Sequence, residues 1–255
     1  MLVLGVCSLK GGVGKTSVTL GLASAALARE LRTLVIDLDP QADATVGLGA
    51  GGTDRLDVAA VLDDPRAVTI ERAIAPSGWA QTGLDVLRGS ARSATHDGPG
   101  GGADLDRLAF VRTFLGGYDL VLIDCPPSLG TLTRAGLTAC DRAVVVTEPG
   151  LFAVMAVGRA LRTIEELGRG SAHRLQPLGI IVNRVGRSAE QVFRLAELQQ
   201  LYGLLVLSPT VPERACVQQA QGAARAVHSW PGAPAAALSV VFDQLLEQVL
   251  RAPQS

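Results

Sequence analysis

The sequence predicts an α/β fold, a single domain over residues 1–255 built on a mostly parallel, twisted sheet with helices on both faces. Short apolar runs alternate with longer helical patterns along the chain. The runs are apolar at consecutive positions, which is typical of strands buried on both faces of a parallel sheet. Hydrophobic residues make up 48% of the 255 residues and charged residues 18%, so there is enough apolar material for one sizeable core.

Each apolar run predicts a strand, and helical patterns fall between the runs. Strands are expected at residues 2–9, 33–37, 84–88, 119–124, 142–148, 178–183 and 204–208. Helices are expected at residues 15–31, 54–63, 104–115, 131–139, 152–168, 188–202, 213–226 and 235–251. Residues 89–104 (GSARSATHDGPGGGAD) are of low complexity and predict a mobile surface loop rather than a domain boundary.

The composition excludes several classes of protein. The chain has 23 basic and 24 acidic residues, a net charge of −1, so the molecule as a whole is no obvious binder of polyanions. Aromatic residues make up 4%, which argues against a stacking platform for single-stranded nucleic acid. The four cysteines form no C-x-x-C pair and the three histidines are scattered, so we expect reduced thiols and a cytoplasmic protein. No apolar run approaches the ~18 residues of a membrane span.

The strongest motif is a glycine-rich loop, KGGVGKTS, between the first strand and the first helix. Backbone N–H groups in such a loop wrap phosphate oxygens, and the helix N-terminus adds partial positive charge. The second lysine would reach the β- and γ-phosphates, and the threonine hydroxyl would ligate Mg²⁺. The ordinary P-loop has its first glycine where this chain has Leu9. The residues expected to hold the nucleotide are Lys10, Gly11, Gly12, Val13, Gly14, Lys15, Thr16 and Ser17.

Both lysines of the chain lie in this loop, whereas the other 21 basic residues are arginines. A lysine ammonium is a compact charge on a flexible stem, and an arginine guanidinium is a wide planar fork. The use of lysine at positions 10 and 15 alone therefore indicates a role that arginine does not fill.

Carboxylates end two of the predicted strands. Asp37 and Asp39 follow the apolar run of LVIDLDPQADAT, and Asp124 ends the run of DLVLIDCPPSLG. In α/β sheets the carboxyl ends of the strands form the edge where ligands bind. Phosphoryl transfer depends on groups that position Mg²⁺ and the attacking water, so these carboxylates are candidates for both tasks. An Asx-Pro turn is the structural alternative for the first pair.

The loop closely resembles the deviant Walker A box of the ParA/MinD family of ATPases, whose pattern is KGG-x-GK-[ST], and the later boxes occur in the family's order. The resemblance implies ATP and Mg²⁺ as ligands. It implies that Lys10 crosses a nucleotide-sandwich dimer to the partner's ATP, that Lys15 is the ordinary P-loop lysine, and that Asp39 orients the attacking water. Lys10, Lys15 and Asp39 are then the catalytic residues, and Thr16, Asp37 and Asp124 form the metal shell.

The resemblance also implies contacts to the base. Asn183, which ends the apolar run of IIVNR, matches a family asparagine that hydrogen-bonds the adenine edge. Pro212 and Glu213 match a segment that contacts the base, mostly through its backbone. A turn-forming asparagine at a strand end is the alternative for Asn183.

For function, the resemblance implies a ParA/Soj-type partition ATPase on the nucleoid. ATP closes a homodimer, the dimer binds double-stranded DNA without sequence preference, and a ParB-like partner triggers hydrolysis. The alternative is a MinD-like positioning ATPase, which needs a basic amphipathic C-terminal helix. The end of the chain, VVFDQLLEQVLRAPQS, carries two acids and one arginine, so we expect no membrane contact. A non-catalytic nucleotide-binding scaffold stays open, although Asp39 and Asp124 are both present.

The expected DNA surface lies late in the chain, where residues 184–225 hold five arginines and three acids. Arg194, Arg214 and Arg225 are the candidates, chosen by charge and position. Glu213 and Cys216 stand where the resemblance leads us to expect basic residues. The alternative is a solvated helical face with no DNA contact.

Overall fold

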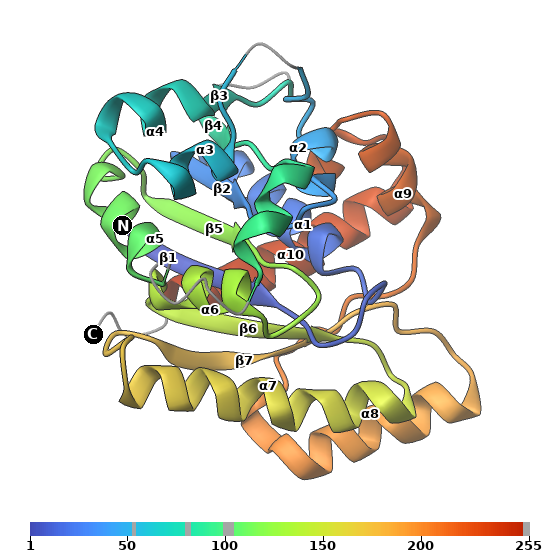
Figure 1. Cartoon of the computed structure of the whole chain (residues 1–255). Coiled ribbons are helices and arrows are strands. Elements are labelled where there is room, and N and C mark those ends of the chain that lie inside the picture. The colour runs from blue at the N-terminus through green and yellow to red at the C-terminus, as the bar shows by residue number, and fades with distance from the viewer. Residues whose placement is uncertain (53–54, 80–82, 99–104, 252–255) are drawn as a thin grey trace.

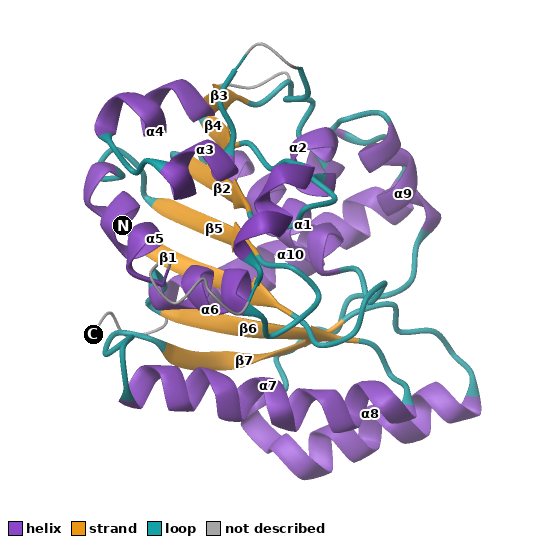
Figure 2. Ribbon diagram, viewed as in Figure 1, coloured by secondary structure: helices purple, strands orange, loops and turns teal. Residues whose placement is uncertain are grey.

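The computed structural model describes residues 1–52, 55–79, 83–98 and 105–251 and confirms the predicted fold class. Seven strands form one sheet in the order β3-β4-β2-β5-β1-β6-β7, and β3 alone is antiparallel to its neighbour (Figure 2). The strands are β1 (Leu2–Cys7), β2 (Thr33–Asp37), β3 (Ile74–Pro76), β4 (Leu84–Leu87), β5 (Leu120–Asp124), β6 (Arg142–Thr147) and β7 (Gln176–Val182).

Helices cover both faces of this sheet (Figure 1). The helices are α1 (Lys15–Ala28), α2 (Asp43–Gly47), α3 (Val58–Asp63), α4 (Ala67–Ala73), α5 (Leu105–Val111), α6 (Thr131–Thr138), α7 (Leu151–Arg169), α8 (Ala189–Tyr202), α9 (Ala215–Gly222) and α10 (Ala233–Arg251). Within the described ranges, no helix is both long enough and apolar enough to cross a lipid bilayer.

Alternate residues of the central strands face two separate cores. In β5, Leu120 and Leu122 pack with α1 and α10, whereas Val121 and Ile123 pack with helices on the opposite face. Side chains alternate between the faces of a strand, so a strand that is apolar throughout must have a core on each side. This burial is why the consecutive apolar runs of the sequence mark the strands correctly.

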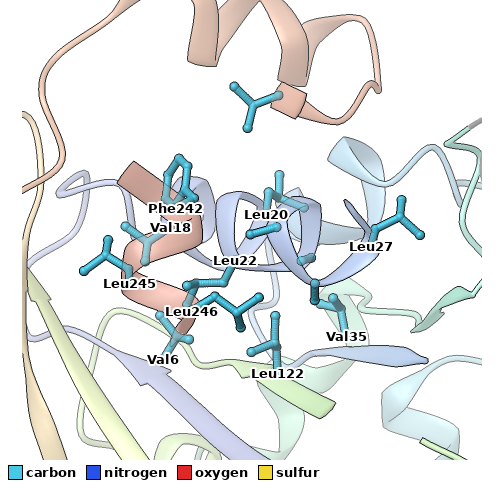
Figure 3. Packing of buried hydrophobic residues seen from close by; sticks show 14 of the residues in the cluster. Val6, Val18, Leu20, Leu22, Leu27, Val35, Leu122, Phe242, Leu245 and Leu246 are labelled. Atoms are coloured by element: carbon cyan, nitrogen blue, oxygen red, sulfur yellow. The ribbon is translucent and has the colours of Figure 1, made fainter. Parts of the chain in front are cut away.

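One core is closed by contact between α1 and α10 (Figure 3). Phe242 of α10 is buried against α1, and a Cβ on Gly21 would lie 2.2 Å from its ring. Leu245 and Leu246, on the same face of α10, lie in the same cluster (Figure 3). The described part of the last helix therefore uses its apolar face within the molecule.

The strand register places two acidic side chains together. Asp37 is paired with Asp124 across β2 and β5, and Val6 of β1 is paired with Asp124 on the other side. Parallel strands end at a common edge, so the loop that follows β1 meets both carboxylates there. This edge is where the glycine-rich loop lies.

The structure corrects one predicted strand and adds elements too short to predict. Residues 204–208 form no strand: Gly203–Leu205 make a turn of 3₁₀ helix, and one isolated bridge joins Val206 to Ile180. Leu204 is fully exposed, so the apolar run is not buried on two faces. The unpredicted elements are α2, α4 and β3.

The predicted mobile loop at residues 89–104 lies partly outside the described residues. In its described part, Ala91–His96 form a 3₁₀ helix and Ser93 is buried. The side chain of Asp97 accepts a hydrogen bond from the backbone N–H of Leu132. This bond ties the segment to the first turn of α6. Mobility of the loop stays a prediction.

Candidate nucleotide-binding site

The glycine-rich loop connects β1 to α1, which begins at Lys15. Gly12 and Gly14 have φ values of 80° and 83°, in the left-handed region that favours glycine. Gly14 is also the residue before the helix and has no capping side chain. The first backbone N–H groups of α1 are therefore available to an anion, as the helix dipole favours.

Asn183, at the end of β7, braces this loop. Its Nδ2 donates hydrogen bonds to the carbonyl oxygens of Val13 at 2.8 Å and of Gly14 at 3.4 Å. A Cβ at Gly14 would lie 2.2 Å from the same nitrogen, so the loop fits closely against the amide. The side chain predicted to contact the base thus contacts the loop backbone in this structure, and its contact with a base stays a prediction.

Asp124 is the centre of the pocket floor. Its Oδ1 is 2.9 Å from Lys15 Nζ and accepts a hydrogen bond of 2.8 Å from the Thr19 hydroxyl. Its Oδ2 accepts a hydrogen bond of 2.8 Å from the Thr16 hydroxyl. The predicted residues Lys15, Thr16 and Asp124 therefore converge. Thr19 was not predicted; its position one helical turn after Lys15 is the signal that could have found it.

Asp39 also lies beside Lys15, with Oδ2 at 3.6 Å from Nζ. Burial alone would lower the pKa of Lys15, but the adjacent carboxylates of Asp124 and Asp39 raise it above its ordinary value. The Lys15 ammonium therefore stays charged in the pocket. Asp39 Oδ1 accepts a hydrogen bond of 3.1 Å from the N–H of Gln41, which fixes the carboxylate at the pocket wall.

Asp37 is buried behind this group. Its Oδ2 accepts hydrogen bonds from the N–H and the hydroxyl of Thr45, at 2.8 and 2.7 Å. Its Oδ1 is buried without a hydrogen-bond partner among the described residues. Burial, and after it the negative charge of Asp124, raises the pKa of Asp37 to about 7.

These residues fit a divalent cation. Asp37 has an unpartnered buried oxygen, and the nearby negative charge of Asp124 disfavours its ionisation, which a cation would relieve. Carboxylate and hydroxyl oxygens are the donors that Mg²⁺ prefers. Thr16, Asp37 and Asp124 are thus suitable to hold Mg²⁺, directly or through its water molecules.

Lys10 lies at the rim of the pocket and is half-exposed. Its Nζ is 2.5 Å from Glu148 Oε1, just beyond the end of β6. Glu148 was not predicted, because its contact joins positions 138 residues apart in the chain. The lysine is therefore held within its own chain by an ion pair that another anion near the loop would compete for.

The glycine-rich loop, Asp39 and α2 line a pocket of about 410 Å³ that is open to solvent. Arg184 and Gln221 also line it, and Gln221 was not predicted as a pocket residue. Pro212 and Glu213 do not line it; the N–H of Glu213 donates to the carbonyl of Val185 at 3.2 Å, in the segment that follows β7. Their contact with a base stays a prediction.

The three candidate DNA-binding arginines differ in environment. Arg194 forms ion pairs with Glu190 at 2.7 Å and Glu197 at 2.9 Å, so its charge is balanced within α8. Arg214 and Arg225 are exposed at the two ends of α9 and make hydrogen bonds only to backbone carbonyls in the described structure. The free positive charge of this set is therefore on α9.

A strand, a glycine loop and a helix that bring Lys15, Thr16 and Asp124 together define the class of P-loop nucleotide-binding proteins. A family model described as an AAA domain matches residues 1–176. The chromosome partitioning protein ParA of Caulobacter vibrioides is 33% identical over 233 residues, which cover 86% of this chain and 83% of that protein. The chain belongs to the ParA/MinD family, and its relatives include proteins of the ParA/Soj type.

Two further relatives support this assignment. The chromosome-partitioning ATPase Soj of Thermus thermophilus is 29% identical over 269 residues, covering 97% of this chain and 94% of that protein. A cobyrinic acid a,c-diamide synthase from Mycobacterium smegmatis, solved with a bound ATP analog and magnesium, has a TM-score of 0.78 at 28% identity. That comparison covers 100% of this chain and 98% of the other.

Proposed function

We propose that this chain is an ATP-dependent DNA segregation ATPase. ATP and Mg²⁺ bind the pocket, two loaded copies form a dimer, and the dimer binds double-stranded DNA without sequence preference. A ParB-like partner protein then stimulates hydrolysis and releases the DNA. The observation that carries the proposal is the convergence of Lys15, Thr16, Asp39 and Asp124 in one pocket at the carboxyl edge of the sheet.

The pocket supplies what phosphoryl transfer needs. The backbone of the loop and Lys15 bind the phosphates, and Thr16 and Asp124 hold the metal shell. A bound Mg²⁺ would neutralise charge on the β- and γ-phosphates. When ATP binds, phosphate oxygens replace the carboxylate oxygens as partners of the Lys15 ammonium, so the lysine keeps anionic neighbours.

Asp39 orients the attacking water in this proposal. One of its oxygens is fixed by the N–H of Gln41, and the other lies 3.6 Å from Lys15, on the side where the γ-phosphate would be bound. A fixed carboxylate accepts a hydrogen bond from the water molecule and so directs a lone pair of the water oxygen at the phosphorus. The carboxylates of Asp124 and Asp39 outweigh the effect of burial on the pKa of Lys15, so this neighbour stays charged.

Lys10 supports the dimer part of the proposal. It is half-exposed on the pocket rim and paired only with Glu148 in the described structure. A phosphate of a second copy's ATP carries more charge than one carboxylate, so it competes for the ammonium. The Lys10 side chain then leaves Glu148 and contacts the partner's nucleotide.

The MinD-like alternative has less support. It requires an amphipathic helix with a free apolar face for lipid. In the described part of α10 that face is buried: Leu238, Phe242 and Leu245 each expose at most 1% of their surface. The DNA-binding proposal instead uses Arg214 and Arg225, which are both exposed.

ATP hydrolysis by purified variants tests the proposal. Asp39→Ala is expected to keep ATP binding and to lower turnover at least about 100-fold, because the water is no longer oriented. Lys15→Ala is expected to weaken ATP binding by about 10- to 100-fold, because a charge-assisted phosphate contact is lost. Glu71→Ala, at an exposed position of α4, is the control. Parental turnover in Asp39→Ala would refute the assigned role.

A further inference from the structure

The C-terminal end of α9 contacts the nucleotide pocket through Gln221. Its Oε1 accepts a hydrogen bond of 3.3 Å from the hydroxyl of Ser17, the last residue of the glycine-rich motif. Both side chains line the pocket. Ser17 lies in α1, two residues after Lys15. A residue 204 positions further along the chain is thereby joined to the nucleotide loop.

The amide nitrogen of Gln221 has no hydrogen-bond partner in the described part of the chain. A carboxamide has two N–H donors, and only its oxygen is used here. The side chain is half-buried and lines the pocket, so this nitrogen is free to donate to a ligand bound there. Lys15 and Thr16 serve the β- and γ-phosphates, so the oxygens left for Gln221 are those of the ribose and the α-phosphate.

The turn that follows Gln221 fixes the backbone around Arg225. The N–H of Arg225 donates to the carbonyl of Ala220 at 2.9 Å, and the N–H of Ala224 donates to the carbonyl of Gln221 at 3.0 Å. Ala224 has a φ of 47°. This pair of bonds with a left-handed residue is a Schellman motif, which ends α9 in a defined geometry. Arg225 is therefore held at a fixed position relative to Gln221.

Gln221 and Arg225 also share a second, small cavity. It is lined by both residues together with Trp79 and Phe242, directly behind the nucleotide pocket. The guanidinium of Arg225 lies 5.6 Å from the centre of the Trp230 ring. The side chains of Gln221 and Arg225 therefore line one cavity, so a rearrangement of one changes the packing around the other.

We propose that Gln221 donates a hydrogen bond to a ribose or α-phosphate oxygen of the bound nucleotide and so couples nucleotide binding to the position of Arg225. This inference rests on the proposed function, since it takes ATP as the ligand and α9 as a DNA-contacting element. Gln221 is a binding residue for the nucleotide and a positioning residue for the arginine.

The first test measures ATP and ADP affinity of Gln221→Glu by titration calorimetry. Glutamate has the same shape and keeps an acceptor for Ser17 but has no N–H donor. We expect about tenfold weaker binding of both nucleotides. Gln221→Leu, which adds no charge, is expected to show a similar loss. Gln219→Glu, exposed on the same helix, is the matched control and should bind as the parent does.

The outcomes separate this inference from the proposed function. Parental affinity in both Gln221 variants would overturn the inference while leaving ATP binding intact. A parent chain that binds no ATP would overturn the proposed function itself. Deoxyribose analogues identify the acceptor: equal losses for ATP and its 2′- and 3′-deoxy forms on Gln221→Leu point to the α-phosphate, and a smaller loss for one analogue points to that hydroxyl.

The second test measures DNA binding at saturating ATP, where parent and variant are equally loaded. We expect Gln221→Leu to bind a random duplex at least about fivefold more weakly than the parent, because Arg225 is no longer positioned by the nucleotide. Without nucleotide the two proteins should bind DNA equally. Equal DNA affinity of the loaded proteins would overturn the coupling.

Discussion

Asp37 lies where the parallel pairing of β2 and β5 brings two carboxyl groups to one level of the sheet. Its pKa is raised to about 7, first by burial and then by the charge of Asp124. The folded chain therefore binds more protons than the unfolded chain between the ordinary 3.8 and about 7. The contribution of Asp37 to stability falls as the pH rises through that window.

Replacing Asp37 by asparagine should therefore stabilise the chain in the absence of Mg²⁺ and nucleotide. Asparagine keeps one acceptor for Thr45 and removes the charge beside Asp124. At pH 7.5 we expect a gain of at least about 1 kcal/mol, or roughly 2–4 °C in Tm for a chain of this size. At pH 4 the two proteins should converge. Thermal unfolding followed by circular dichroism measures this, with Glu71→Gln as the control. A variant that matches the parent at both pH values would contradict the raised pKa.

At the scale of single residues, the sequence predicts the pocket where a motif spans a few positions. Lys15, Thr16, Asp39 and Asp124 could be assigned because each belongs to a short pattern at a strand end. Glu148 and Gln221 could not. Their roles depend on partners 138 and 204 positions away, and no local pattern encodes such a contact.

At the scale of elements, α1 packs against α10 through a close approach of Gly21 to Phe242. A methyl group at position 21 would meet the ring at 2.2 Å. Alanine is the better helix former by about 1 kcal/mol, but overpacking in a rigid core costs about 1–3 kcal/mol. The steric effect exceeds the gain in helix propensity, because the ring is buried and has no room to move.

We therefore expect Gly21→Ala to lower the free energy of unfolding by about 1–2 kcal/mol, measured by urea denaturation. In a Phe242→Leu background, which leaves room for the methyl group, the same substitution should be neutral or stabilising. A stabilising effect of Gly21→Ala in the parent background would show that α10 does not pack on α1 in this way.

The elements that the sequence predicts are those with a long, uniform pattern. β2 is predicted to the residue, because four consecutive apolar or strand-forming residues are followed by an aspartate. The short elements α2 and β3 have five and three residues, too few for a period to appear. The predicted helix at 213–226 ends early, at Gly222, because Ala224 adopts a left-handed conformation that terminates it.

At the scale of the whole molecule, the exposed arginines of α9 carry the proposed DNA contact. Phosphate contacts depend on free cations, and a dimer doubles their number. Charge reversal of both residues, Arg214→Glu with Arg225→Glu, should weaken ATP-dependent binding to a random duplex at least about tenfold and leave basal ATP hydrolysis unchanged. The affinity of the parent should fall steeply as salt rises.

Fluorescence anisotropy with a labelled duplex measures this effect. Arg169→Glu, exposed at the far end of α7, is the matched charge-reversal control. Arg194→Ala should have a small effect, because Glu190 and Glu197 already balance its charge. Parental DNA affinity in the double variant would make α9 a solvated face and place the DNA surface elsewhere.

In the proposed function, ATP joins two copies of this chain through Lys10. The mass of Asp39→Ala, which should hold ATP without hydrolysing it, is the most direct measure. With ATP and Mg²⁺, light scattering should give twice the chain mass of 26.4 kDa, and Lys10→Ala in the same background should stay at the monomer mass. An Asp39→Ala protein that is saturated with ATP and still has a mass of 26.4 kDa would contradict the claim.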